Sequence, residues 1–169
     1  AALMTSVLDS AAKISGYIAE CKELGIPVLP PDVNHSEDQF TVDGNAIRFG
    51  LGAVKNVGHG LVRAMCAKRE EGGSFKSLED FIQRMGEEIN KRAVENFIKC
   101  GAMDCFGHHR SELLAVYDSM MDSVSSSRKK NLEGQIGLFS LLEDDTAVAI
   151  PIPKLPERSK AELMAMEKE

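Results

Sequence analysis

The stretch Gly50-Leu-Gly-Ala-Val-Lys-Asn-Val-Gly-His-Gly-Leu-Val-Arg-Ala-Met-Cys-Ala-Lys-Arg69 decides the fold of this chain. Its apolar residues recur at three- and four-residue steps, which is the spacing of one apolar helix face. The central residues 56–60, Asn-Val-Gly-His-Gly, place two glycines in that pattern, and glycine permits the sharp turn that joins two helices. The stretch therefore predicts a helix-hairpin-helix.

The loop of this predicted hairpin has the features of an anion site. Glycines leave backbone N–H groups uncovered at the start of the following helix, where the helix dipole favours negative charge. Lys55 and Arg63 flank the loop. A nucleic-acid phosphate is the usual ligand of such a loop, so we predict contacts with a DNA backbone here.

A second unit of similar size follows. Ser77 is a good helix N-cap with Asp80 three residues later, residues 86–90 turn the chain, and residues 91–100 have a second helical pattern. Two such units are expected to pack as a pair and to present both hairpins to the two strands of a duplex. The DNA-binding residues predicted for the two hairpins are Lys55, Asn56, Val57, Gly58, His59, Gly60, Arg63, Asn90, Lys91 and Arg92.

The residues before the first hairpin predict a helix and a small β-hairpin. Residues 1–23 carry an apolar helical stripe that Gly25 ends, and three prolines in residues 26–34 exclude a helix there. Alternating β-formers in residues 40–49 flank an Asp-Gly turn at Asp43, a strong hairpin signal. We expect this hairpin to brace the helix that follows it.

The residues after the second unit predict an amphipathic helix and a flexible tail. The helical pattern of residues 110–121 gives way to three serines and a basic run, which are typical of a solvated linker. Residues 134–140 then form a short apolar patch in polar surroundings, three prolines stiffen residues 151–156, and a helix restarts near residue 157. The predicted segments are 1–37 (helix and Pro-rich connector), 38–107 (β-hairpin and tandem helix-hairpin-helix), 108–127 (amphipathic helix), 128–156 (flexible tail and Pro-rich linker) and 157–169 (helix). The predicted fold class is mainly α.

Charge limits the kind of nucleic-acid contact. The chain has 169 residues and a net charge of −6, which argues against attraction over the whole surface. Residues 48–92 nevertheless hold nine Lys or Arg against six Asp or Glu. This modest local excess predicts weak, local phosphate binding.

Neither a membrane span nor a metal site is predicted. No apolar stretch is long enough to cross a bilayer, and the four cysteines lie at irregular spacings inside helical segments, as reduced core cysteines of a cytosolic protein do. Zinc ligation by Cys100, Cys105, His108 and His109 would rely on one local cluster with adjacent histidines, so we do not favour it. The chain starts without Met, and we expect it to be a piece of a larger protein.

Several motifs, in order and across nearly the whole chain, resemble the C-family replicative DNA polymerases of bacteria. They are Tyr-Ile-Ala-Glu-Cys-Lys-Glu-Leu-Gly-Ile (17–26), Leu-Pro-Pro-Asp-Val-Asn (29–34), Ile-Arg-Phe-Gly-Leu-Gly-Ala-Val-Lys-Asn-Val-Gly (47–58), Phe-Lys-Ser-Leu-Glu-Asp-Phe (75–81), Asn-Lys-Arg (90–92) and Ile-Lys-Cys-Gly-Ala-Met-Asp (98–104). The resemblance implies the tandem helix-hairpin-helix and clamp-binding region that follows the fingers and precedes an oligonucleotide-binding module.

The resemblance implies two partners for this region: duplex DNA, held by its backbone, and the β sliding clamp. The clamp-binding peptide of such polymerases is Gln-x-x-Leu-Phe, and the residues that match it are Gln135, Ile136, Gly137, Leu138 and Phe139. Gly137 departs from the polar residue often found there. The resemblance also implies other replisome subunits as partners, no membrane, and a bacterial cytoplasmic location.

Catalysis is expected to lie elsewhere in the parent polymerase. That enzyme is a nucleotidyltransferase whose palm aspartates bind Mg²⁺, and this chain contains no Asp-x-Asp triplet, so we expect no catalytic residue and no cofactor here.

Two other functions are compatible with the motifs. A base-excision enzyme would need a catalytic Asp shortly after the hairpin, but Glu70 and Glu71 follow it and the first Asp is Asp80. A structural bundle that joins polymerase modules without touching DNA is the stronger alternative, because Glu87 and Glu88 in the second hairpin would repel phosphate.

Overall fold

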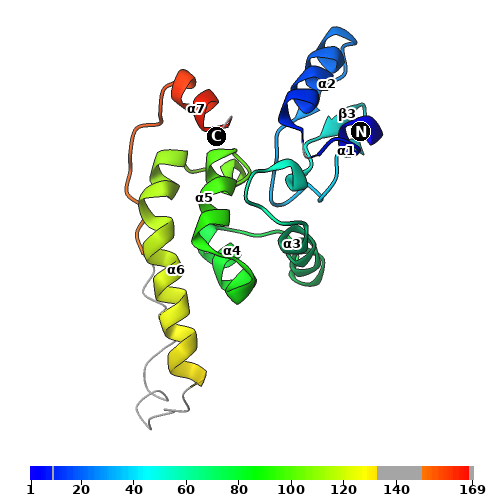
Figure 1. Ribbon diagram of the computed structural model, residues 1–169. Coiled ribbons are helices and arrows are strands. Elements are labelled where there is room, and N and C mark those ends of the chain that lie inside the picture. Colours follow the sequence, from blue (N-terminus) through cyan, green and yellow to red (C-terminus); the bar gives the residue numbers. More distant parts are fainter. Residues whose placement is uncertain (9, 133–149, 168–169) are drawn as a thin grey trace.

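The computed structural model of the protein describes residues 1–8, 10–132 and 150–167. Figure 1 shows an N-terminal unit of helices and strands beside a helical bundle. The elements in chain order are α1 (Ala2–Thr5), α2 (Ala11–Glu23), β1 (Val28–Leu29), β2 (Thr41–Asp43), β3 (Ala46–Arg48), η1 (Leu51–Ala53), α3 (His59–Gly72), α4 (Leu78–Met85), η2 (Gly86–Glu88), α5 (Lys91–Lys99), η3 (Asp104–Phe106), α6 (Arg110–Leu132) and α7 (Lys160–Met166), where η marks a 3-10 turn. The predicted mainly helical class is confirmed.

The N-terminal unit has a small core of its own. The predicted single helical segment is broken into α1 and α2, with a turn at residues 6–8 after α1, and Ile14 on α2 packs with Met4, Phe40 and Ile47. Gly25 has a φ of 71° and ends α2, as predicted. The break lets both helices bury one face against the sheet.

The predicted β-hairpin is present and belongs to a three-stranded sheet. Strands β2 and β3 are antiparallel, with Asp43 opposite Ala46 across a two-residue loop whose Gly44 has a φ of 60°. The sequence did not predict β1, which comes from the Pro-rich connector and pairs in parallel with β3, giving the order β1-β3-β2. The connector serves as an acceptor in this pairing, since the carbonyls of Pro27 and Leu29 accept the N–H groups of Ile47 and Phe49.

The first helix of the predicted helix-hairpin-helix is shortened to the 3-10 turn η1. The backbone N–H groups of Leu51 and Gly52 donate to the carbonyls of Glu37 and Asp38, so they are not used in a helix. The reversal toward α3 occurs at Asn56, which has a φ of 61°, whereas Gly58 is extended with a φ of −81°. The prediction that the loop glycines supply the positive φ is therefore wrong.

The second unit is a complete helix–turn–helix, as predicted. The Ser77 hydroxyl accepts the N–H of Asp80 and caps α4, and the Asn90 side chain accepts the N–H of Ala93 and caps α5. Between them, Gly86 has a φ of 58° and η2 completes the turn. Both caps satisfy helix-end donors that would otherwise be unpaired.

Helix α6 is longer than predicted. It continues through the serines to Leu132, so residues 123–128 are helical and the flexible tail does not begin at residue 128. Met120 and Met121 are buried, Val124 packs on the same core, and the Arg128 guanidinium donates to the carbonyl of Gln83 on α4. Apolar contacts therefore extend the helix beyond the point where its composition becomes polar.

The bundle core lies where α3, α4, α5 and α6 meet. Figure 1 shows α4 and α5 between the long α6 and α3. Phe81 packs edge-to-face against both Phe75 and Phe97, with centroid distances of 4.9 and 6.1 Å. Each such buried side chain contributes about 1.5–3 kcal/mol to folding. The other large, fully buried side chains of this core are Val33, Leu51, Met65, Leu78, Ile82, Met85, Ile98, Met103 and Leu113.

The C-terminal part returns along the bundle. Residues 150–157, here called the strap, lie against α6, and Ile150 and Ile152 pack on the bundle core, so this end of the predicted flexible tail is ordered. The helix predicted to restart near residue 157 is α7, which begins with a capping box between Ser159 and Glu162. In the part of the chain that the structure describes, no helix is long and apolar enough to cross a membrane.

Candidate nucleic-acid interface

The turn between η1 and α3 exposes most of the residues predicted to bind DNA. Lys55, Asn56, Gly58, His59 and Gly60 are exposed. The remaining residue of the turn, Val57, is only 7% exposed and belongs to the bundle core, which agrees with its place in the apolar helical pattern of the stretch. Its apolar side chain anchors the turn, and only its backbone is near the surface.

The start of α3 is an uncapped helix N-terminus. Gly58 is the N-cap and makes no side-chain cap, because it has no side chain. A Cβ at Gly58 or Gly60 would meet nothing within 4 Å, so the backbone there is bare on its solvent side. N–H groups at such an end are unpaired within the helix, and the helix dipole adds positive potential.

His59 is held at this helix start by Asp38. Its Nδ1 lies 2.7 Å from the Asp38 Oδ1, and the His59 side chain is half exposed. Asp38 was not predicted to belong to the site, because it lies 21 residues earlier, in the loop before the β-hairpin, and no local spacing links the two residues. The pairing fixes the imidazole beside the bare backbone.

Several of the basic residues counted in this region serve the fold instead. Arg69 donates to the carbonyls of Val33 and Ser36, at 3.1 and 2.9 Å. Arg84 stacks over the ring of Phe75 and donates to backbone carbonyls at the end of α3, and Arg48 pairs with an aspartate of the β-hairpin. The basic excess seen in the sequence therefore overstates the charge available to DNA.

Arg63 remains available, one helical turn after His59. It is exposed, and within residues 1–8, 10–132 and 150–167 its side chain forms no hydrogen bond or ion pair. The structure thus places His59 and Arg63 at the start of α3, and Lys55 is exposed in the turn that precedes them.

The second hairpin has a different electrostatic environment. Glu87 and Glu88 of η2 are exposed. The Lys91 Nζ lies 2.7 Å from an oxygen of Asp118 and 2.7 Å from one of Asp122, both on α6. The hydrogen bonds that Lys91 donates to these two aspartates raise its pKa. The charge of Lys91 is therefore already compensated within the protein.

The two hairpins are joined by one side chain of α5. The Asn96 amide donates to the carbonyl of Lys55 at 2.9 Å. Arg92, one turn earlier on α5, is exposed and forms no side-chain hydrogen bond or ion pair with the rest of the described chain. Asn90 is exposed, but its side-chain oxygen is used as the cap of α5.

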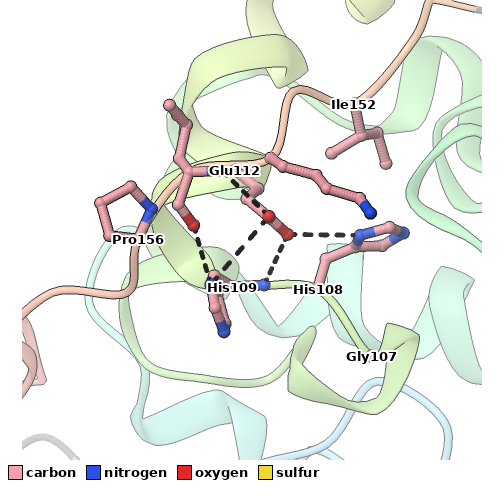
Figure 2. A pocket seen from close by; sticks show the side chains of 8 residues that line it. Gly107, His108, His109, Glu112, Ile152 and Pro156 are labelled. Atoms are coloured by element: carbon pink, nitrogen blue, oxygen red, sulfur yellow. Dashed lines mark hydrogen bonds and ion pairs between the residues drawn. The ribbon is translucent and has the colours of Figure 1, made fainter.

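A hollow of about 580 Å³ lies between α6 and the strap. Figure 2 shows Glu112 between His108, His109 and the strap. Glu112 accepts the backbone N–H groups of His109 and Leu155, at 3.0 and 3.1 Å, and the His109 ring lies 2.9 Å from the Leu155 carbonyl. These polar groups satisfy one another, so the hollow is a seam between two segments and not a ligand site.

The residues considered above as zinc ligands, Cys100, Cys105, His108 and His109, lie in or near this region. Of the residues that the structure describes, no three His, Cys, Asp or Glu side chains gather in a way that suits a metal ion. Burial raises the pKa of the Cys100 thiol to about 12, which disfavours the thiolate that zinc needs. His108 and His109 face Glu112.

Comparison with known proteins identifies the class. A family model described as "Helix-hairpin-helix motif" matches residues 25–113, more than half of the chain, which therefore belongs to the helix-hairpin-helix family. The match spans the sheet, both hairpins and the start of α6, so the shortened first helix is still part of a recognised motif.

Three relatives with similar sequences are each named DNA polymerase III subunit alpha. The chain is 44% identical to that of Thermus aquaticus over 92% of its length, 37% to that of Chlamydia pneumoniae over 100%, and 41% to that of Mycobacterium tuberculosis over 90%. The resemblance to bacterial replicative polymerases is confirmed. The chain spans only 13–14% of the length of these relatives.

Proposed function

We propose that this chain is the segment of a replicative DNA polymerase that holds the sugar–phosphate backbone of duplex DNA through its first hairpin. The observation that supports this most directly is the bare, uncapped start of α3, with His59 and Arg63 beside it, inside a helix-hairpin-helix family match. Backbone N–H groups and cationic side chains bind phosphate without reading bases. Binding is therefore independent of sequence and weakens steeply with salt.

The parent protein is proposed to be a DNA-directed DNA polymerase of the bacterial cytoplasm, a nucleotidyltransferase that uses Mg²⁺. The names of the relatives support this proposal. The sequence contains no Asp-x-Asp triplet, so we propose that the catalytic aspartates of the parent lie outside this segment.

The second proposed partner is the β sliding clamp. The peptide Gln135–Phe139 lies outside the described residues, and its sequence alone supports the proposal. Together, the two contacts would keep the polymerase on its template and support processive synthesis alongside other replisome subunits.

The test of DNA binding is a fluorescence-anisotropy titration of a primer–template duplex with the 169-residue chain, at about 50 and 200 mM salt. We expect binding at the lower salt that is insensitive to base sequence. The double substitution His59→Ala and Arg63→Ala removes two of the proposed contacts and should weaken binding by about tenfold or more, since a phosphate contact is worth about 1 kcal/mol.

A matched control is the pair His108→Ala and Arg158→Ala, which removes an exposed histidine and an exposed arginine from the α6 and strap side of the molecule. It should leave DNA affinity unchanged. Absence of binding at low salt, or equal losses in both double variants, would contradict the proposed DNA contact.

A further inference from the structure

The cations of the two hairpins face different surroundings, although each hairpin was predicted to grip one strand. Lys91 lies between two carboxylates at 2.7 Å each, supplied by Asp118 and Asp122, which are four residues apart and so lie on one face of α6. A DNA phosphate would have to displace both carboxylates to reach this ammonium group. That exchange gains little, because one anionic partner only replaces another.

The turn before Lys91 adds further negative charge. Glu87 and Glu88 are exposed in η2, and the nearest cation to Glu88 is Lys68, at 4.0 Å. The α5 N-terminus is also capped by Asn90, unlike that of α3. The second hairpin therefore lacks the bare helix start of the first, and the charge of its Lys91 is already paired.

Arg92 is adjacent to Lys91 but belongs to another face of α5. It is four residues before Asn96, so the two side chains lie on the same face of the helix. Asn96 donates to the carbonyl of Lys55 in the first hairpin, which places that turn against this face. Arg92 is exposed there and forms no hydrogen bond or ion pair with its side chain in the described chain.

We propose that the chain grips duplex DNA at one composite site, in which Arg92 of α5 joins the first hairpin, and that Lys91 fastens α5 to α6 and does not bind DNA. Asn96 is the positioning residue, since it ties the turn that carries Lys55 to the helix that carries Arg92. This inference rests on the proposed DNA contact. It differs from the expectation that each hairpin binds one strand, because it places all the phosphate contacts at one site.

Lys91 and Arg92 provide a matched pair of substitutions, because they are neighbours with the same charge on the same helical turn. In the anisotropy titration, Arg92→Ala should weaken binding about five- to tenfold and reduce the slope of log affinity against log salt by about 0.9, the value for one lost phosphate contact. Lys91→Ala should leave affinity within about twofold, which is the effect expected of a residue that makes no phosphate contact. It should instead lower the melting temperature, because it leaves two aspartates without their partner.

The double substitution Asp118→Asn and Asp122→Asn separates a lost contact from a loosened fold, since it breaks the same ion pairs and keeps Lys91. If Lys91→Ala weakens binding as much as Arg92→Ala while this double variant binds normally, Lys91 touches DNA and the inference is overturned. An unchanged affinity of Arg92→Ala overturns it as well. Absence of DNA binding by the unsubstituted chain overturns both this inference and the proposed function, whereas equal effects of the two alanines beside a normally binding double variant overturn this inference alone.

Discussion

At the residue scale, the glycines of the stretch 50–60 perform two unlike tasks. A Cβ at Gly50 would lie 2.5 Å from the carbonyl carbon of Gln39 and 2.7 Å from the nitrogen of Phe40. A Cβ at Gly60 would meet no atom within 4 Å. The first glycine is required by close backbone packing, and the second leaves the backbone bare toward solvent.

The substitution Gly50→Ala should therefore destabilise the fold, by about 1–3 kcal/mol, as overpacking against immovable atoms does. The neighbouring atoms are backbone, so they cannot rotate away. Urea unfolding followed by circular dichroism measures the change. An unaltered free energy of unfolding in Gly50→Ala would contradict this prediction, because it would mean that the backbone of residues 38–40 can move to make room for the methyl group.

Gly60→Ala is the matched control for this prediction. Alanine is favoured over glycine inside a helix by about 0.5–1 kcal/mol, so the free energy of unfolding should stay the same or rise. The contrast between the two variants tests whether close approach, and not glycine content as such, matters in this stretch.

The sequence predicted which residues surround the turn, but it did not predict the partners of their side chains. Lys55, His59 and Arg63 were predicted from their places around the turn, and all three are exposed at or near the start of α3. Val57 was predicted among the DNA-binding residues of the loop, and its periodic position within the apolar pattern agrees with its burial in the structure. The partner of His59 could not be predicted, because Asp38 is brought to it only by the folding of the β-hairpin.

At the element scale, the strap is fastened to α6 by charge as well as by apolar packing. The backbone N–H of His109, followed by that of Leu155, lowers the pKa of Glu112. The Leu155 carbonyl is the main cause that raises the pKa of His109. The folded state thus favours the charged forms of both groups.

These shifts give the seam a pH dependence of known sign. Because the pKa of Glu112 is lower in the folded protein, its contribution is complete above the ordinary glutamate pKa, about 4.3, and is lost as the pH falls through the lowered value. The substitution Glu112→Gln should therefore lower the melting temperature at pH 6, and the gap to the unsubstituted protein should close as the pH falls toward about 3.

Thermal unfolding of the two proteins across this pH range provides the measurement. Glu70→Gln, at an exposed position of α3, serves as the control and should show no such pH-dependent gap. A difference in melting temperature that stays constant down to low pH would mean that the hydrogen bonds and packing of Glu112 stabilise the fold and its charge does not. His109 works in the opposite direction, since its contribution is present below the ordinary histidine pKa and is lost as the pH rises through the raised value.

Helix boundaries were predictable where a side chain caps the helix and not where tertiary contacts set its length. Ser77 was predicted to begin α4 and does so, and the predicted start of the next helix at Lys91 coincides with that of α5, which Asn90 caps. The end of α6 was predicted too early, because burial of Met121 and Val124 outweighs the polar composition of the serines. The first helix of the hairpin ends after η1, because the backbone is already extended at Val54 and turns left-handed at Asn56, which no local pattern predicts.

At the scale of the whole molecule, the charge of the chain indicates that the proposed DNA contact needs a second contact to support it. The net charge is −6, and Arg48, Arg69, Arg84 and Lys91 are used within the fold. Few cations remain for DNA, so the duplex contact alone is expected to be weak. A second contact with a ring around the DNA would raise the local concentration of duplex to the millimolar range typical of short tethers.

The peptide Gln135–Phe139 is proposed to make that second contact, with Leu138 and Phe139 as its apolar anchors. Replacing both anchors by alanine should cost at least about 2 kcal/mol of binding energy, the usual loss at a hot spot, which corresponds to about a 30-fold weaker complex with the sliding clamp. Calorimetric titration of the clamp with the 169-residue chain measures this. Affinity of the double variant for the primer–template duplex should be unchanged, because the proposed DNA site lies on α3 and α5.

The neighbouring pair Leu141 and Leu142 offers a control of similar size in the same segment. If only apolar content mattered, replacing these two leucines by alanine would weaken the clamp complex as much as replacing Leu138 and Phe139. The peptide hypothesis instead requires a large loss for the first pair and little for the second, because a short motif binds through particular anchors at fixed spacing. Full clamp affinity without Leu138 and Phe139 would leave the first hairpin and Arg92 as the only proposed link to the template, too few contacts to hold a polymerase on DNA at physiological salt.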